Sequence, residues 1–114
     1  ASKIRGTIIL SGSTGETHDG TMFDPPIKQA NSSFLLLIHE NDQCSSSESL
    51  EGLKRFSDEL TSVKDKKIVQ LTGGIPSRGS GRGPWCSPRS HHGFNGIHDQ
   101  VVEVIKTWVL KRIN

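Results

Sequence analysis

The chain of 114 residues contains no tyrosine and few other aromatic residues, with four phenylalanines and two tryptophans. Apolar residues make up only 32% of it, which is little for a domain that must bury its own core. None of its apolar runs approaches the roughly 20 residues that a membrane-spanning helix needs. We therefore expect residues 1–114 to form a single small domain that has no membrane span.

An excess of charge of one sign is also lacking, because the net charge is only +2. A balance this small does not indicate a nucleic acid or an anionic membrane as partner. Arg78, Arg82 and Arg89 do lie among glycines, with Trp85 as the one aromatic residue nearby that could stack on a base. We interpret this segment as a solvated loop or a flap over a pocket, and we expect no nucleic-acid partner.

Cysteine occurs only twice, as Cys44 and Cys86. Two thiols fit one disulfide, two buried free thiols or half of a metal site. Neither cysteine has a second ligand at the close spacing typical of zinc sites, so we expect no metal and no other cofactor. A disulfide would indicate a periplasmic or secreted protein, because the cytosol keeps thiols reduced; without it we expect a cytoplasmic protein.

Three short apolar runs are present, at residues 7–10, 34–38 and 68–71. The first two are continuous rather than alternating, which is typical of strands buried on both faces of a parallel sheet. A polar loop precedes the second run, and a loop rich in glycine, proline and arginine follows the third. Both loops are long for a small domain, and long loops in compact domains are usually functional or disordered.

Two segments have helical periodicity, residues 48–60 and residues 99–113. Ser45 and Glu48 have the spacing of a capping box at the start of the first, and Asp99 is the expected N-cap of the second. The apolar side chains that share one face of the first segment are Leu50, Leu53, Phe56 and Leu60.

The order of these elements predicts an α/β fold, since strands separated by a helix form right-handed parallel crossovers. We expect a partial sheet of about three parallel strands with two helices. The helices should cover roughly one face of it. Another chain, or a second copy of this one, would then complete the sheet.

Two kinds of chemically active side chain follow these strands. Asp42 lies four residues after the second apolar run, and His91 and His92 follow the third. The carboxyl ends of parallel strands meet at one edge of the sheet, where ligands bind in open α/β folds. A carboxylate that accepts from one nitrogen of an imidazole leaves the other free to act as a general base.

The motif LLLIHENDQC, then a helix, a strand and the segment SHHGFNGIHDQVVEVIKTWV, resembles the C-terminal part of serine α/β-hydrolases. The likeness is greatest to bacterial members with an Asp-x-Cys turn and a His-Gly-Phe segment, and it covers nearly the whole chain. It implies that Asp42 is the acid of a catalytic triad and His92 its histidine, with His91 as the alternate. The reaction implied is hydrolysis of a small ester or similar acyl compound.

The nucleophile of that family is missing, because the chain contains no G-x-S-x-G elbow. The nearest segment is SGSTG at residues 11–15, which makes Ser13 an alternate nucleophile, but no helical pattern follows it. We therefore expect no hydrolysis by this chain alone. The nucleophile would come from another chain, and association with that chain or with itself is the expected state.

Cys44 and Cys86 flank the implied acid and histidine, so a disulfide between them would tie the acid turn to the histidine loop. The alternative is Cys44 as nucleophile with His92 as its base. A different class of function also stays open, in which the chain is a non-catalytic binding or interaction module that keeps a hydrolase-like scaffold.

Overall fold

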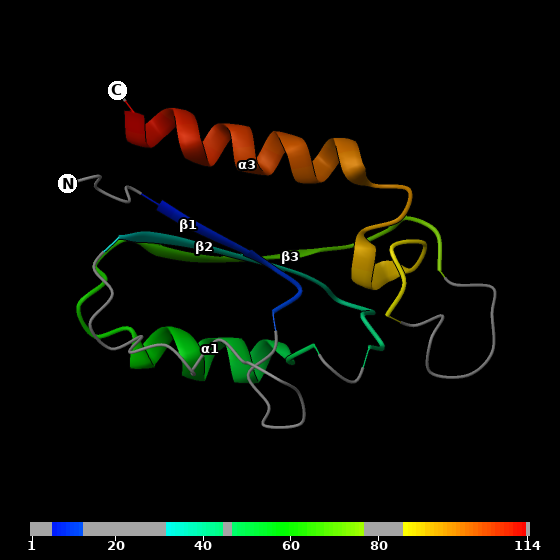
Figure 1. Ribbon diagram of the computed structural model, residues 1–114, viewed down its shortest axis with the longest axis horizontal. Helices are drawn as coiled ribbons and strands as arrows, with labels where there is room; N and C mark the ends of the chain where they lie inside the picture. Colours follow the sequence, from blue (N-terminus) through cyan, green and yellow to red (C-terminus); the bar gives the residue numbers. More distant parts are fainter. Residues whose placement is uncertain (1–5, 13–31, 45–46, 77–85, 114) are drawn as a thin grey trace.

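The computed structural model describes residues 6–12, 32–44, 47–76 and 86–113. Three strands, β1 (Gly6–Leu10), β2 (Ser33–His39) and β3 (Lys66–Leu71), form one parallel sheet in the order β1-β2-β3. The helix α1 (Leu50–Glu59) lies on one face of this sheet, and α3 (His98–Ile113) lies on the other, as Figure 1 shows. A short 3-10 helix, η2 (His91–Gly93), precedes α3. The predicted α/β sheet of three parallel strands with two helices is confirmed.

The central strand β2 is buried from Phe34 to His39, which explains its uninterrupted apolar sequence. Its alternate side chains serve two separate clusters. Those that face α1 pack with Leu53, Phe56 and Leu60, whereas Leu35 and Leu37 pack with Val101 and Trp108 of α3. Both faces of the sheet are therefore covered, and the expectation that the chain covers roughly one face was wrong.

The helix α1 begins at a cap that the sequence pattern did not single out. Ser49, not Ser45, is its N-cap, and the Ser49 hydroxyl accepts a hydrogen bond from the N–H of Gly52 at 3.1 Å. Ser45 lies outside the described residues. The predicted end of this helix near residue 60 is confirmed, because α1 ends at Glu59.

The helix α3 packs closely on the sheet through Trp108, which is 6% exposed. A Cβ atom at Gly6 of β1 would lie 2.7 Å from Trp108 Cη2, so the indole needs a glycine at this position. At the end of α3, the Arg112 guanidinium binds both carboxylate oxygens of Asp65, at 2.6 and 2.7 Å. Asp99 lies in the first turn of α3, which begins one residue earlier than predicted, and is therefore not its N-cap.

Neither helix of the described part of the chain has both the length and the apolar content needed to cross a membrane.

Candidate functional site

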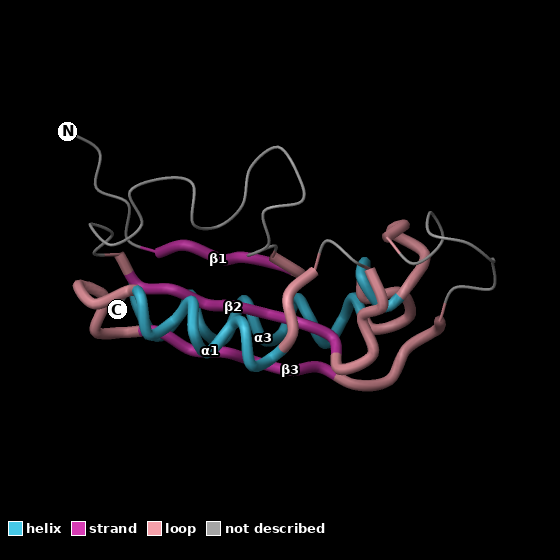
Figure 2. The backbone as a smooth tube through the Cα atoms, turned by 90° about the horizontal axis from the view of Figure 1, so that it is seen from below, coloured by secondary structure: helices cyan, strands magenta, loops and turns pink. Residues whose placement is uncertain are grey.

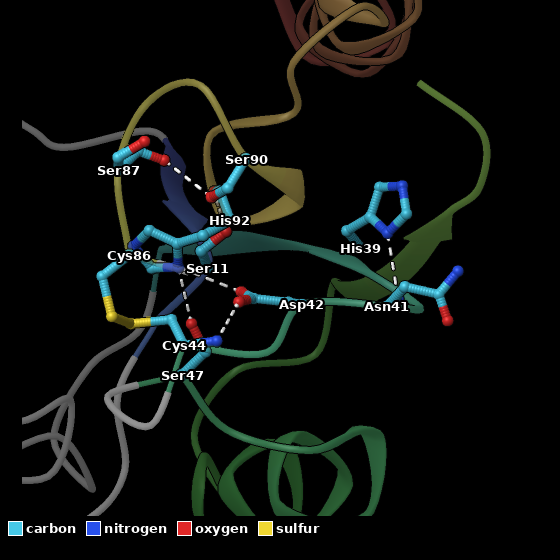
Figure 3. Close-up of polar contacts among 10 residues, drawn as sticks. All are labelled: Ser11, His39, Asn41, Asp42, Cys44, Ser47, Cys86, Ser87, Ser90 and His92. Atoms are coloured by element: carbon cyan, nitrogen blue, oxygen red, sulfur yellow. Dashed lines mark hydrogen bonds and ion pairs between the residues drawn. A yellow bond between two sulfur atoms is a disulfide. The ribbon is translucent and has the colours of Figure 1, made fainter. Parts of the chain in front are cut away.

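The candidate site lies beyond the carboxyl ends of the three parallel strands, where the segments that follow β1, β2 and β3 meet (Figures 1 and 3). We call it the carboxyl edge and define it as Ser11, residues 39–44, Ser47 and residues 86–97. Figure 2 shows how the strands run side by side toward this end of the molecule. The sheet topology thus brings together segments that are far apart in the sequence.

Asp42 and His92 are in direct contact, as their positions after neighbouring strands predicted. The Nδ1 atom of His92 lies 3.0 Å from Oδ2 of Asp42 (Figure 3). The Asp42 side chain is only 5% exposed, whereas that of His92 is 25% exposed. Because a carboxylate only accepts, the proton of this bond belongs to Nδ1, and Nε2 is the nitrogen left for a substrate.

The orientation of the Asp42 carboxylate is fixed by its own turn. Its second oxygen, Oδ1, accepts a hydrogen bond from the N–H of Cys44 at 2.9 Å. The N–H of Asp42 in turn donates to the carbonyl of His39 at 3.2 Å, which begins the turn directly after β2. Short side chains that bind the backbone two residues ahead are typical of Asx-turns, so local chemistry aims this acid.

A disulfide joins Cys44 to Cys86, with Cα atoms 4.7 Å apart. It connects the turn that carries Asp42 to the loop that leads to His92, as expected if the two cysteines pair. Neither sulfur is then a thiolate, so the alternative in which Cys44 is a nucleophile does not fit this structure.

Two serines that the sequence did not indicate complete the surroundings of His92. Ser47 Oγ lies 2.7 Å from the same Nδ1 atom that faces Asp42, and the Ser11 hydroxyl donates to the His92 carbonyl at 2.7 Å. Ser47 therefore contacts Nδ1, the nitrogen that orients the ring. A nucleophile would have to contact the other nitrogen, Nε2. Ser11 follows β1, so its position at a strand end was a signal for it; Ser47 is in a run of serines with no such signal.

The backbone around His92 adopts conformations that are unfavourable for side chains with a Cβ atom. Ser11 has a φ of 51° and Phe94 a φ of 55°, and they are the two non-glycine residues of the described chain with positive φ. Phe94 is only 4% exposed, so a bulky buried residue adopts a left-handed backbone conformation here. Strain of this kind costs on the order of 1–3 kcal/mol at each residue and tends to occur at functional sites.

His91, the alternate to His92, lies in a different environment. Its ring stacks on that of His39 with centroids 4.0 Å apart, and its Nδ1 atom is buried without a hydrogen-bond partner. Burial and the neighbouring His39 lower the pKa of His91 from its usual 6.5, although Asp42 and Glu40 oppose the shift. His92, not His91, therefore makes the hydrogen bond to Asp42, and His91 packs against His39.

His39 is structural in these surroundings, as its place at a strand end suggests. It is 2% exposed, and its Nε2 atom lies 2.6 Å from the carbonyl of Gly73, so Nε2 carries the ring proton. The Nδ1 atom then accepts the N–H of Asn41 at 2.9 Å. With both nitrogens occupied, His39 has no nitrogen left for substrate chemistry.

Two further predictions concern residues beyond this cluster. Ser13, the alternate nucleophile, and the arginine–glycine segment around Arg78, Arg82 and Trp85 lie outside the described residues. Among the residues that are described, no group of three or more His, Cys, Asp or Glu side chains is placed to hold a metal ion.

Comparisons of the chain with protein-family models, with curated proteins and with solved structures found no match.

Proposed function

We propose that this chain supplies the histidine and the acid of a Ser-His-Asp triad that hydrolyses a small ester or similar acyl compound, with the nucleophilic serine coming from another chain. The observation that carries the proposal is the contact of 3.0 Å between Asp42 and His92 Nδ1. This contact gives an oriented imidazole whose Nε2 atom is the free basic nitrogen.

The proposed roles follow from the two nitrogens of the ring. Nε2 of His92 takes the proton of the serine hydroxyl as the serine oxygen attacks the acyl carbon. The same nitrogen then gives this proton to the departing alkoxide, and water repeats the sequence to release the acid. Asp42 accepts from Nδ1 throughout, so it holds the tautomer and stabilises the transient imidazolium.

Three features of the site support a chemical rather than a purely structural role. Asp42 is nearly buried, which strengthens its interaction with an imidazolium compared with an exposed pair. Its carboxylate is held by the Cys44 N–H, and the segments that carry the pair are joined by the disulfide. Strained backbone occurs at Ser11, which binds the His92 carbonyl, and at Phe94, two residues after His92.

The test is hydrolysis of p-nitrophenyl esters together with labelling by a fluorophosphonate probe. Both are measured on the chain alone and on the chain with its co-purified material. We expect no label on the isolated chain, and labelling of a serine on a second chain when both are present. Asp42→Asn should lower the rate of the complex by roughly 10⁴-fold and His92→Asn by roughly 10⁶-fold.

Asp58→Asn is the matched control for Asp42→Asn, because Asp58 is exposed on α1 and lies outside the Asp42–His92 pair. It should leave the rate unchanged. If no chain is labelled and no ester is hydrolysed, the hydrolase proposal fails. The remaining hypothesis is then that the chain is a non-catalytic binding module on the same scaffold. An active complex that is indifferent to His92→Asn would also contradict it.

A further inference from the structure

In the part of the chain that the structure describes, one edge of strand β3 is unpaired. Within the described residues β3 pairs with β2 alone, so its other side offers backbone groups to a further strand. The carbonyls of Asp65 and Leu71 accept from the N–H groups of Phe34 and Glu40, so the odd-numbered residues here direct their backbone toward β2. Backbone direction alternates along a strand, which leaves Lys66, Ile68 and Gln70 to face outward.

A groove of about 530 Å³ runs beside this edge, between β3 and α3. Its lining takes in four consecutive residues of β3, Lys67 to Gln70, and its apolar part includes Val69, Val104 and Trp108. Four charged residues also line it, Lys67, Glu103, Lys111 and Arg112, and Arg112 is paired with Asp65. The free edge and the groove therefore form one continuous surface, with charges of both signs on it.

We propose that this surface binds the same surface of a second copy of the chain, by antiparallel pairing of β3 with β3 about a two-fold axis at Ile68. Ile68 then lies opposite itself, and Lys66 lies opposite Gln70 of the other copy. In both pairs each residue directs its N–H and carbonyl outward, as a hydrogen-bonded antiparallel pair requires. The two sheets become one sheet of six strands, with the two α3 helices on the same face.

Glu103, the acidic residue of the groove, meets a lysine of the other copy in this register. Arg112 binds Asp65, which fixes the end of α3 beside the start of β3. A helix rises about 1.5 Å per residue and a strand about 3.3 Å per residue. Glu103 therefore lies about 13 Å from Arg112 along α3, and Val69 lies about 13 Å from Asp65 along β3, so the two are at the same level of the groove. Val69 is the residue opposite Lys67 of the second copy. Each Glu103 is thus level with a lysine of opposite charge from the other chain.

Lysines on an edge strand usually prevent pairing with another strand. This register avoids that repulsion, because Lys66 faces Gln70 and Lys67 faces Val69, so no lysine lies directly opposite another. Among the described strands β1 has the other unpaired edge, but Gly6–Leu10 contains no charged residue that could fix a register there. The proposal does not rest on the hydrolase function, because β3 pairing uses neither Asp42 nor His92.

The test is the dissociation constant of the dimer, measured by sedimentation equilibrium on the full chain. Gln70→Pro removes an outward N–H while leaving the N–H groups that bind β2, and proline is tolerated at such edge positions. We expect it to raise the dissociation constant roughly a hundredfold or more. Gln70→Thr, which keeps the N–H, is the matched control and should leave the dimer intact.

A second set of variants tests the register without proline. Lys67→Glu should weaken the dimer about tenfold by placing two carboxylates at the same level, and Lys67→Glu combined with Glu103→Lys should restore it. This set decides the matter if Gln70→Pro does not fold by circular dichroism. A chain that stays monomeric, a dimer unaffected by Lys67→Glu, or failure of the double variant to restore pairing would each overturn the proposal.

Discussion

The molecule has two regions that are held together by different forces. The layered body, which consists of the three strands with α1 and α3, is held by apolar packing on both faces of β2. The carboxyl edge is held by a disulfide and by hydrogen bonds that join residues up to 81 positions apart, from Ser11 to His92. Its buried residues include the polar side chains of His39 and Ser90.

This difference separates overall stability, which comes mainly from the body, from the positioning of side chains, which comes mainly from the edge. Burial of apolar area is not directional, so most of the body gains its stability without fixing the angle between particular polar groups. Hydrogen bonds depend on distance and angle, so the edge can hold an imidazole and a carboxylate in one arrangement. We therefore expect a change in the apolar body to lower stability most, and changes in the edge to act on local order or pH response as well as on stability.

Phe56→Ala should have the largest effect, because Phe56 is fully buried between α1 and the sheet. The lost transfer energy and the cavity left behind should reduce the free energy of unfolding by about 3–5 kcal/mol, measured by urea denaturation. Val102→Ala in α3 is the control, since Val102 is 61% exposed and should change stability by less than about 0.5 kcal/mol. Equal effects of the two variants would contradict the packing described here.

Removing the disulfide with Cys44→Ser and Cys86→Ser should have the next largest effect. The bond spans a sequence separation of 42, and the chain-entropy model assigns such a link about 4 kcal/mol at most. The His92 ring should also lose its fixed position, which NMR signals of the imidazole would show directly.

A control for this prediction is a single Cys44→Ser variant. It should expose one reactive thiol at Cys86 and change the mobility of the chain on a non-reducing gel. If the thiol count of the unaltered chain already equals two, the disulfide does not form in solution.

The smallest effect concerns pH and His91. Its pKa is lowered in the folded chain by burial and by His39, so the unfolded state takes up the proton at a higher pH. Stability from neutral His91 is thus fully present above about pH 6.5 and is lost as the pH falls through the lower folded pKa. Denaturation midpoints at pH 7.5 and 5.5 would measure this loss.

His91→Phe is the matched variant, because it keeps an aromatic ring against His39 but cannot be protonated. The difference in stability between the two pH values should become smaller in this variant. Asp65 does not interfere, since its pKa is lowered from 3.8, mainly by the hydrogen bond from Arg112, and its loss begins only at lower pH. An unchanged difference between the two pH values would contradict the role given to His91.

Much of the body was predictable from local patterns. The continuous apolar run of β2 indicated a strand buried on both faces, and the periodicity of α1 and α3 placed both helices to within about two residues. The cover of both faces was not predicted, because periodicity shows that a helix has an apolar side but not which face of a sheet receives it. The cap at Ser49 was missed for a similar reason, since several neighbouring serines have the same chemistry.

For the site, the sequence indicated Asp42 and His92 because both follow strands of one parallel sheet. It did not separate His92 from His91, because adjacent residues have nearly the same place along the chain. The 3-10 helix η2 decides between them by pointing the rings in different directions, one to Asp42 and one to His39.

The sequence by itself determined the elements, their order and the presence of an acid, a histidine and two cysteines after the strands. These follow from local chemistry and from the rule that parallel strands end at a common edge. Only the tertiary structure decided which histidine meets the acid, that Ser47 and Ser11 join them, and that β3 pairs with β2 alone among the described strands. Such contacts depend on the relative placement of segments tens of residues apart, which no local pattern specifies.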